Sequence, residues 1–236
     1  MAVHRTEGES GRRYVVVAGS VVVLWSAILL LMLSLGWLVT DVLGDSLDPV
    51  DNDLSEWLAD QRTGTLTDLA EVGGTGGDTI TICAIALVVA IGASVWARSV
   101  RPLIFLAVGL VGQALVYDLT SRLITRDRPP VKLLDHGLDS NASYPSGHVS
   151  TAVMFFGGVV ALVWVYAAPR WRAPAMLLLV VPLVVGAARL YQGAHHLTDA
   201  LASLVVMPFW VLALTVLILR PQLETADQNR SLTPTR

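Results

Sequence analysis

Residues 143–156 read SYPSGHVSTAVMFF, and they place a histidine, His148, between a Pro-Ser-Gly turn and a strongly apolar run. The run Val149–Ala168 is close to the roughly 20 residues that a helix needs to cross the hydrocarbon core of a bilayer. Ionisable side chains at membrane depth are costly, and they are therefore candidates for a functional site. This stretch predicts a membrane helix that begins beside a functional histidine.

Composition places the whole chain among integral membrane proteins. Of its 236 residues, 54% are hydrophobic and 15% are charged, and the mean hydropathy is +0.62. These values lie outside the range of soluble globular domains. The net charge of -3, without a Lys/Arg-rich run interleaved with aromatic residues, argues against a nucleic-acid partner.

Six apolar windows approach the length of a membrane helix, so we expect an all-α, six-transmembrane-helix bundle. The first window is far longer than the roughly 7–15 apolar residues of a signal-peptide core, and we expect it to be a retained helix. The fifth window is short and contains Pro174 and Pro182, which membrane helices tolerate when neighbouring groups satisfy the backbone. Cys83, inside the second window, is expected to be a small core or lipid-facing residue. The windows are Tyr14–Thr40, Thr79–Ala97, Pro102–Leu119, Val149–Ala168, Ala173–Ala188 and Asp199–Leu219.

The distribution of Lys and Arg predicts the orientation, because short basic segments stay in the cytoplasm. The segment between the first two spans is rich in Asp and Glu and contains Arg62 as its one basic residue. We therefore expect residues 1–13 to be a cytoplasmic segment, residues 14–220 a membrane domain and residues 221–236 a disordered cytoplasmic tail. The basic residues assigned to the cytoplasmic side are Arg5, Arg12, Arg13, Arg98, Arg101, Arg170, Arg172 and Arg220.

The link between the third and fourth spans breaks this charge rule. It is assigned to the outside, yet its stretch SRLITRDRPPVK, residues 121–132, is strongly basic. Contact with anionic headgroups explains any single arginine there. Several cations beside a double proline favour an anion-binding site instead. The cations are Arg122, Arg126, Arg128 and Lys132.

The link between the fifth and sixth spans, ARLYQGAHHLTDA at residues 188–200, opens on the same face. Arginine forks bind phosphate oxygens bidentately, and a Ser-Gly turn offers backbone N–H groups and a hydroxyl to the same anion. A helix that begins by about His195 would place that ring and Asp199 on one face. The carboxylate would then keep one ring nitrogen protonated and leave the other free to attack. We expect the following residues to converge at one depth: Arg128, Ser146, His148, Arg189, His195 and Asp199.

These residues resemble the three motifs of the type 2 phosphatidic acid phosphatase superfamily, which includes membrane lipid phosphatases. The first motif, a lysine, six residues and Arg-Pro, aligns with SRLITRDRP and ends at Arg128-Pro129. The second, Pro-Ser-Gly-His, is intact at residues 145–148. The third, Ser-Arg, five residues, His, three residues and Asp, aligns with Arg189, His195 and Asp199. The resemblance covers about residues 50–220, and three motifs in order on one membrane face are highly specific.

The resemblance implies phosphoryl transfer through a phosphohistidine, with no metal or other cofactor. It implies that His195 attacks phosphorus, and that His148 protonates the leaving group and then activates water. Asp199 completes the catalytic set. Phosphate binding is implied for Arg128, Arg189, Ser146 and Gly147.

Two positions depart from the family motifs. The lysine position holds Ser121, with Arg122 one residue later, and the serine position before Arg189 holds Ala188. We expect Arg122 to supply the missing cation, because a long arginine side chain can extend toward the polar layer. If it points elsewhere, the phosphate pocket has one charge fewer.

Other polar residues have simpler explanations. His196 is expected about 100° around the helix from the nucleophile, as a polar side chain at the interface. His136 is expected to be an exposed loop residue, and Gln113 to hydrogen-bond between helices. Asp118 is expected to pair with Arg122 one helical turn later.

The segment before the second span, residues 52–77, alternates apolar and polar positions. This pattern indicates a short helix that lies at the membrane interface, and GGTGG, residues 73–77, indicates a flexible hinge after it. The helix is either part of a lateral entry for a lipid or a simple connector. Its apolar positions are Leu54, Trp57, Leu58, Leu66 and Leu69.

The leading functional hypothesis is an enzyme that removes phosphate from a lipid phosphate or diphosphate at the outer leaflet. Phosphatidic acid, phosphatidylglycerophosphate and a polyprenyl diphosphate such as undecaprenyl diphosphate all remain open as substrates. The alternative is a catalytically weak lipid-phosphate-binding or transport protein of the same fold, which only Ser121 favours. Vanadate-dependent peroxidase chemistry shares the motifs but belongs to soluble chains. The sequence predicts no oligomeric state.

Overall fold

The computed structural model describes residues 3–135 and 137–219, and within them the chain forms helices and no β-strand. Six of its helical stretches are long and apolar enough to cross a membrane, as the sequence predicts. The predictions for the tail 221–236 and for His136 lie outside the described residues. The candidate spans are Tyr14–Val42, Thr79–Ala97, Arg101–Leu123, Gly147–Tyr166, Pro169–Tyr191 and Leu197–Leu219.

The described residues contain nine α-helices and four short 3₁₀ or π segments. The α-helices are α1 (Val3–Trp37), α2 (Gly44–Asp60), α3 (Gly64–Thr75), α4 (Thr79–Ala97), α5 (Arg101–Leu123), α6 (Gly147–Tyr166), α7 (Arg172–Met176), α8 (Val180–Tyr191) and α9 (Leu197–Leu214). The π segments are η1 (Leu38–Val42) and η4 (Thr215–Leu219), and the 3₁₀ segments are η2 (Pro169–Trp171) and η3 (Leu177–Leu179).

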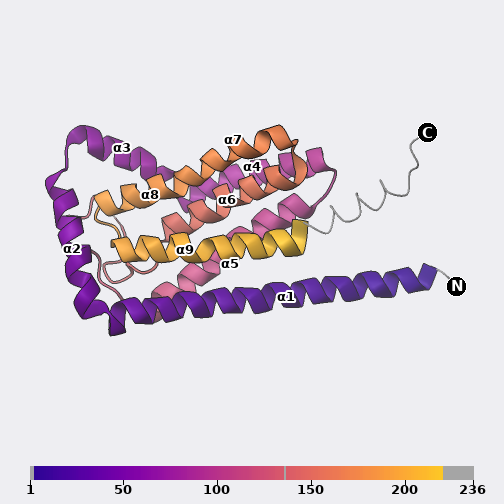
Figure 1. The fold of residues 1–236 in the computed structure, drawn as a ribbon, viewed down its shortest axis with the longest axis horizontal. Helices are drawn as coiled ribbons and strands as arrows, with labels where there is room; N and C mark the ends of the chain where they lie inside the picture. Colours follow the sequence, from indigo (N-terminus) through magenta and orange to yellow (C-terminus); the bar gives the residue numbers. More distant parts are fainter. Residues whose placement is uncertain (1–2, 136, 220–236) are drawn as a thin grey trace.

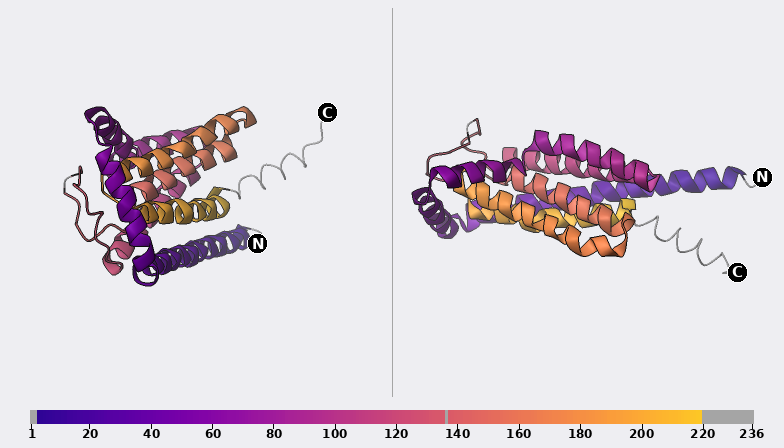
Figure 2. Two further views of the ribbon diagram at one scale, coloured as in Figure 1. Left: turned by 60° about the vertical axis from the view of Figure 1, so that its left-hand side comes forward. Right: turned by 90° about the horizontal axis from the view of Figure 1, so that it is seen from above.

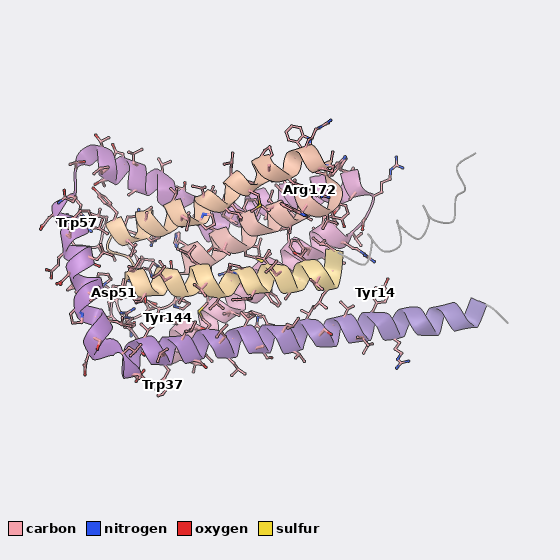
Figure 3. All side chains as sticks on the ribbon, in the orientation of Figure 1. Tyr14, Trp37, Asp51, Trp57, Tyr144 and Arg172 are labelled. Atoms are coloured by element: carbon pink, nitrogen blue, oxygen red, sulfur yellow. The ribbon has the colours of Figure 1, made fainter. Side chains whose placement is uncertain are left out.

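The long helices run side by side, and α2 crosses one end of the bundle almost at right angles to them (Figures 1 and 2). The loop between α5 and α6 and the turn between α8 and α9 both lie at this end, which we call the α2 end. The start of α1 and the end of α9 lie at the opposite end. In Figure 3, Asp51 and Tyr144 lie at the α2 end, and Tyr14 and Arg172 lie toward the other. The two loops that carry the predicted site therefore open on one face.

Small residues on α5 allow its neighbours to approach closely. The indole N–H of Trp25 on α1 donates to the Gly112 carbonyl at 2.9 Å, and that of Trp210 on α9 donates to the Gly109 carbonyl at 3.0 Å. Close approach at small residues and interhelical hydrogen bonds are the usual means of helix association in lipid. The predicted role of Gln113 is confirmed, because its side-chain oxygen accepts a 3.3 Å hydrogen bond from Thr151 on α6.

The fifth span is a chain of short pieces, η2, α7, η3 and α8, rather than one regular helix. Pro182 has no N–H to offer the carbonyl of Leu178, one turn earlier. At that point the helix tightens to 3₁₀ over Leu177–Leu179, and the Val180 N–H contacts the carbonyls of Leu177 and Leu178. Pro182, which the sequence places in this window, therefore explains why the span is not one regular helix.

The connection from the first to the second span contains two helices where the sequence predicted one. Thr63 begins the second of them, because its hydroxyl accepts a hydrogen bond from the Leu66 N–H. On α2, Asp51 and Ser55 are buried toward the bundle, whereas Val50 and Trp57 are exposed. An outward apolar face on a helix that crosses the bundle end suits a position at the bilayer surface.

The glycine-rich segment 73–77 is closely packed rather than a hinge. A Cβ on Gly73 would lie 3.2 Å from Ala188 on α8, and one on Gly77 would lie 2.5 Å from the carbonyl oxygen of His148. The glycines let the end of α3 approach α8 and the first turn of α6. They thereby bring α3 to the predicted site.

Candidate active site at the α2 end

The loop between α5 and α6 is held together by backbone hydrogen bonds between its two arms. Arg126 N–H donates to Asn141 C=O at 3.1 Å, Ser143 N–H donates to Arg126 C=O at 3.0 Å, and Arg128 N–H donates to Ser140 C=O at 2.9 Å. This pairing places Arg126, Arg128 and Ser143 beside one another although they are far apart in the loop. The loop is therefore a scaffold for charged groups.

Tyr144 and the Pro-Ser-Gly turn join this loop to α6. The buried Tyr144 hydroxyl donates to the Met32 carbonyl on α1 at 3.0 Å. Ser146 follows as the N-cap of α6, and its buried Oγ has no hydrogen-bond partner within the described residues. Helix N-termini favour anions, because their first N–H groups lack partners within the helix. Ser146 and Gly147 thus offer a hydroxyl and backbone donors to one anion.

Arg189, in the last turn of α8, presents one edge of its guanidinium group without a partner. Its Nη1 donates to Gln192 Oε1 at 2.8 Å and pairs with Asp135 Oδ2 at 2.7 Å. Nε and Nη2 are buried and have no hydrogen-bond partner among the described residues. These two nitrogens form the edge that binds phosphate bidentately. Because unpartnered buried donors are rare in native proteins, this edge is the strongest sign of an anion site.

His148 and Arg189 line one cavity of about 430 Å³, which we call the His148–Arg189 cavity. It lies between α3, α6, α8 and the loop before α6, and it carries the carboxylates of Glu71 and Asp135. The predicted acid and one predicted phosphate ligand are therefore brought together. The lining residues are Thr67, Glu71, Gly74, Thr75, Leu134, Asp135, His148, Arg189 and Gln192.

His195 lies in the turn before α9 and is 3% exposed. Its Nδ1 is 2.6 Å from the Ser143 carbonyl oxygen. A carbonyl only accepts hydrogen bonds, so the neutral ring carries its proton on Nδ1 and its lone pair on Nε2. Burial lowers the pKa of His195 to about 3; Asp199 opposes this change, and Arg189 adds to it. The ring is held neutral, with Nε2 unprotonated, as a nucleophile requires.

Asp199 does not orient His195 in the way that the spacing predicts. Helix α9 begins at Leu197, after His195, and Asp199 Oδ2 is 4.0 Å from His195 Nδ1, too far for a hydrogen bond. The same oxygen accepts hydrogen bonds from Ser143 Oγ at 2.6 Å and from the His196 backbone N–H at 2.9 Å. Asp199 therefore acts on His195 indirectly. It binds the side chain of Ser143, and the backbone carbonyl of Ser143 binds His195.

Arg126 is predicted from the sequence to be one of the cations of an anion-binding site, but the structure pairs it with carboxylates of the protein itself. It is 6% exposed, and its terminal nitrogens pair with Asp199 at 2.5 Å, Asp48 at 2.7 Å and Asp51 at 3.0 Å. Burial disfavours its charge, yet these carboxylates together raise the pKa of Arg126. Asp51 also accepts a 2.5 Å hydrogen bond from the Thr198 hydroxyl. This ion network joins α2 to the start of α9. The sequence feature that could have indicated it is the acidic segment after the first span, which is predicted on the same face as the basic loop.

His196 is a buried residue and not the interfacial side chain that we expected. It is 4% exposed, and its Nε2 lies 3.3 Å from Asn52 Oδ1 on α2. Its Nδ1 lies 3.5 Å from Asp199 Oδ2. Because α9 begins one residue after His196, the expected offset around a helix does not apply. The ring fills the space between α2 and the Asp199 network.

Arg128 is bonded to the backbone of both loops. Its Nε donates to the Asp139 carbonyl at 2.7 Å, Nη2 donates to the Ala142 carbonyl at 3.0 Å, and Nη1 donates to the Ala194 carbonyl. These bonds hold the residue before His195 against the loop that carries Ser143. Burial lowers the pKa of Arg128, and Arg189 adds to this. Two arginines thus flank the His195 turn.

Arg122 is not brought to the site. Its side chain is 73% exposed and forms an ion pair with Asp118 at 2.7 Å, which confirms the predicted pair one turn apart. Ser121 occupies the fourth position after Tyr117, whose ring lies 3.0 Å from a Cβ built on Gly147. Positions four apart share a helix face, so Ser121 and not Arg122 lies on the side of α5 that faces the Pro-Ser-Gly turn. The missing lysine has no substitute in Arg122.

A second cavity, of about 360 Å³, is lined by Arg126, Arg128 and His196, and we call it the Arg126–His196 cavity. The side chain of His195 lines neither cavity. The residues that line the Arg126–His196 cavity are Thr40, Asp48, Asn52, Thr125, Arg126, Asp127, Arg128, Pro130 and His196.

Comparisons with known proteins agree with the motif resemblance and with the fold. A sequence profile described as the PAP2 superfamily matches residues 102–222, which include all three motifs. A solved structure, the first transmembrane PAP2 type phosphatidylglycerolphosphate phosphatase from Bacillus subtilis, has a TM-score of 0.65 and 19% sequence identity. The match covers 90% of this chain and 98% of that one. At that identity it supports the fold alone. A search of curated protein sequences found no match.

Proposed function

The chain belongs to the PAP2 superfamily, and on that premise we propose that it is a multi-pass membrane phosphatase that hydrolyses a lipid phosphate. One observation carries the proposal. The Nε and Nη2 of Arg189 and the Ser146 Oγ are buried and have no hydrogen-bond partner among the described residues, and Arg189 lines one cavity with His148. Buried donors of this kind are satisfied by an anionic ligand.

The first step forms a bond between His195 Nε2 and phosphorus and breaks the bond from phosphorus to the lipid oxygen. His148 donates a proton to that oxygen, so the lipid leaves as an alcohol. In the second step His148 takes a proton from water, whose oxygen attacks phosphorus and breaks the P–N bond. Inorganic phosphate leaves, and both histidines return to their starting states.

The remaining groups contribute position and charge, which dominate catalysis of phosphoryl transfer. Arg189 binds two phosphate oxygens with its unpartnered edge, and Ser146 and Gly147 donate to a third. The Ser143 carbonyl keeps the Nδ1 proton of His195 in place and stabilises the positive charge that develops on the ring during attack. Arg128 and Asp199 are positioning residues, because they hold the two loops together.

Access to His195 requires a local movement when substrate binds. The ring is 3% exposed and lies outside the lining of the His148–Arg189 cavity. A phosphate bound by Arg189 must therefore enter deeper than the present cavity, toward the His195 turn. Binding energy from the lipid headgroup supplies the drive for this opening, as is common for enzymes that complete their site on substrate binding.

We place the reaction at the extracytoplasmic surface, on the basis of the Lys/Arg distribution. The lipid tail stays in the bilayer, and the phosphate reaches the α2 end at headgroup level. The solved relative acts, by its description, on phosphatidylglycerolphosphate. This lipid is therefore the first substrate to test, followed by phosphatidic acid.

Phosphate release in detergent micelles tests the proposal. The purified chain is expected to release phosphate from phosphatidylglycerophosphate or phosphatidic acid, with and without chelator. His195→Gln keeps a polar side chain of similar length but has no nucleophilic ring, so release is expected to stop. Protein quenched in alkaline denaturant while it turns over labelled substrate is expected to carry a phosphate that is stable to alkali and lost in acid. Full activity in His195→Gln would overturn the assigned nucleophile.

The same assay decides the alternative of a binding or transport protein. Such a protein would bind the lipid phosphate and release no phosphate from it. Ser121, in place of the motif lysine, is the one feature that favours this alternative. Phosphate release that depends on both His148 and His195 would exclude it.

A further inference from the structure

The charges on the wall of the His148–Arg189 cavity bear on a question that the motifs leave open, the number of phosphate groups on the substrate. The cavity carries the carboxylates of Glu71, from α3, and Asp135, from the loop before α6. Arg189 is the one arginine or lysine in its lining. Asp135 already pairs with Nη1 of that arginine at 2.7 Å. The lining is therefore rich in negative charge for a site that must bind an anion.

The family motif would place another cation near this site, and here that cation is missing. Ser121 holds the lysine position, and its hydroxyl donates to the Asp118 carbonyl within its own helix. Arg122 is turned to the surface and paired with Asp118. Arg128 has one bond from each of its three side-chain nitrogens to a backbone carbonyl. Among the candidate phosphate ligands, the described atoms without any hydrogen-bond partner are Nε and Nη2 of Arg189 and Oγ of Ser146, which suffice for a single phosphate group.

From these charges we propose that Glu71 and Asp135 are specificity-determining residues that select a lipid monophosphate over a lipid diphosphate. The inference rests on the proposed function. When one phosphate group of a lipid diphosphate binds the edge of Arg189, its second phosphate group must lie along the cavity wall. There it faces two carboxylates, and the described lining has no arginine or lysine besides Arg189. Like charges brought together reduce binding and specify the partner.

The arrangement distinguishes the roles of the two carboxylates. Asp135 holds Arg189 in place, so it also positions the arginine edge that binds the first phosphate. Glu71 is exposed on α3 and forms no hydrogen bond or ion pair with the described residues that the structure records. Glu71 therefore acts on a second phosphate by charge alone. It is the cleaner residue for a test.

The test compares two pairs of lipids that differ by one phosphate: phosphatidic acid with diacylglycerol diphosphate, and farnesyl phosphate with farnesyl diphosphate. We expect kcat/KM for each monophosphate to exceed that for its diphosphate by roughly tenfold or more, the size of effect that one unfavourable charge contact produces. Glu71→Gln is expected to reduce this ratio several-fold, mainly through a lower KM for the diphosphate. Asp135→Asn keeps an oxygen toward Arg189 and is expected to act in the same direction.

Asp68→Asn is the matched control. Asp68 lies on α3 three residues before Glu71, is exposed and does not line the cavity. The control removes the same charge from the same helix and is expected to leave the ratio unchanged. An equal shift in Asp68→Asn would assign the effect to the general field of α3 and overturn the proposal.

The outcomes separate this inference from the proposed function. Release of phosphate from none of the four lipids would contradict the proposed function itself. Equal or better use of the diphosphates would leave the phosphatase assignment intact and overturn the inference. A ratio that favours monophosphates but does not respond to Glu71→Gln or Asp135→Asn would also overturn it, because the selection would then have another cause.

Discussion

Arg126 and Arg189 are both buried arginines at the α2 end, and their guanidinium groups have opposite surroundings. Arg126 pairs with the carboxylates of Asp48, Asp51 and Asp199. Arg189 has Asp135 and Gln192 on one nitrogen, and its two other buried nitrogens have no partner in the part of the chain that the structure describes. The first arginine is neutralised and joins helices, and the second is held ready for a ligand. The contrast teaches that the function of a buried cation is decided by which of its donors are already used.

The largest effect is expected when Arg126 is replaced. Arg126→Met fills a similar volume but leaves the buried carboxylates of Asp51 and Asp199 without their cation. Breaking a buried pair from one side costs about 3–5 kcal/mol. The thermal unfolding midpoint in detergent is expected to fall sharply, and activity is expected to fall with it.

Arg126→Lys is the control for this change, because it keeps the charge and loses the fork. A midpoint for Arg126→Met close to that of the unchanged protein would refute the anchoring role.

Arg189→Lys is expected to have the opposite signature. The ammonium keeps the ion pair with Asp135, so the unfolding midpoint changes little. The bidentate edge is lost, and removal of one such transition-state donor lowers the rate by about 10²–10³. Steady-state kinetics on phosphatidylglycerophosphate measure the loss in kcat/KM. If stability falls and activity does not, the two arginines do not differ in the way described.

Gly77→Ala tests whether α3 shapes the side of the site that contains Arg189. The added Cβ would lie 2.5 Å from the His148 carbonyl oxygen, so the first turn of α6 must shift. Overpacking of this kind costs about 1–3 kcal/mol. The loss of activity is expected to be more than ten times smaller than the loss in Arg189→Lys. Gly64→Ala, where a Cβ meets nothing within 4 Å, is the matched control. Equal activities for the two alanine variants would show that α3 does not shape the site.

The smallest effect expected is a pH dependence from His195. Its folded pKa of about 3 lies below the ordinary value of 6.5, so on acidification the unfolded chain takes up a proton first. Stability from this group is complete above pH 6.5. It falls by at most about 1.4 kcal/mol for each pH unit between 6.5 and 3. Unfolding midpoints from pH 7 to pH 5 measure this slope, which is expected to be shallower in His195→Gln. Identical slopes would show that the folded ring titrates normally.

The sequence predicted the six spans well because each is a local property, a run of about 20 apolar residues. It also predicted that both motif-bearing loops open on one face, since the number of spans between them fixes this. The division of the first connection into α2 and α3 was missed. Thr63 is an ordinary N-cap residue there, but the apolar positions on either side of it fit one continuous pattern.

The structure brings some of the predicted site residues together and gives others contacts that the sequence did not predict. Arg189, Ser146 and His148 lie where the motif spacing places them. The spacing of His195 and Asp199 suggested a direct bond, but α9 begins after His195, and Ser143 from a distant loop provides the partner. Arg122 was expected at the phosphate, yet Asp118 on its own helix is closer and binds it.

By itself, the sequence determined the membrane class, the number and order of the spans, and the residue types of the candidate site. These follow from composition and from spacings of a few residues. Only the tertiary structure decided how the charges pair. Arg126 and Asp199 are 73 residues apart in the chain, and Arg126 and Asp51 are 75 apart. Coulombic pairing in a buried site depends on distances of a few ångströms, and such distances are set by the packing of α2, the loop before α6 and α9 rather than by any local pattern.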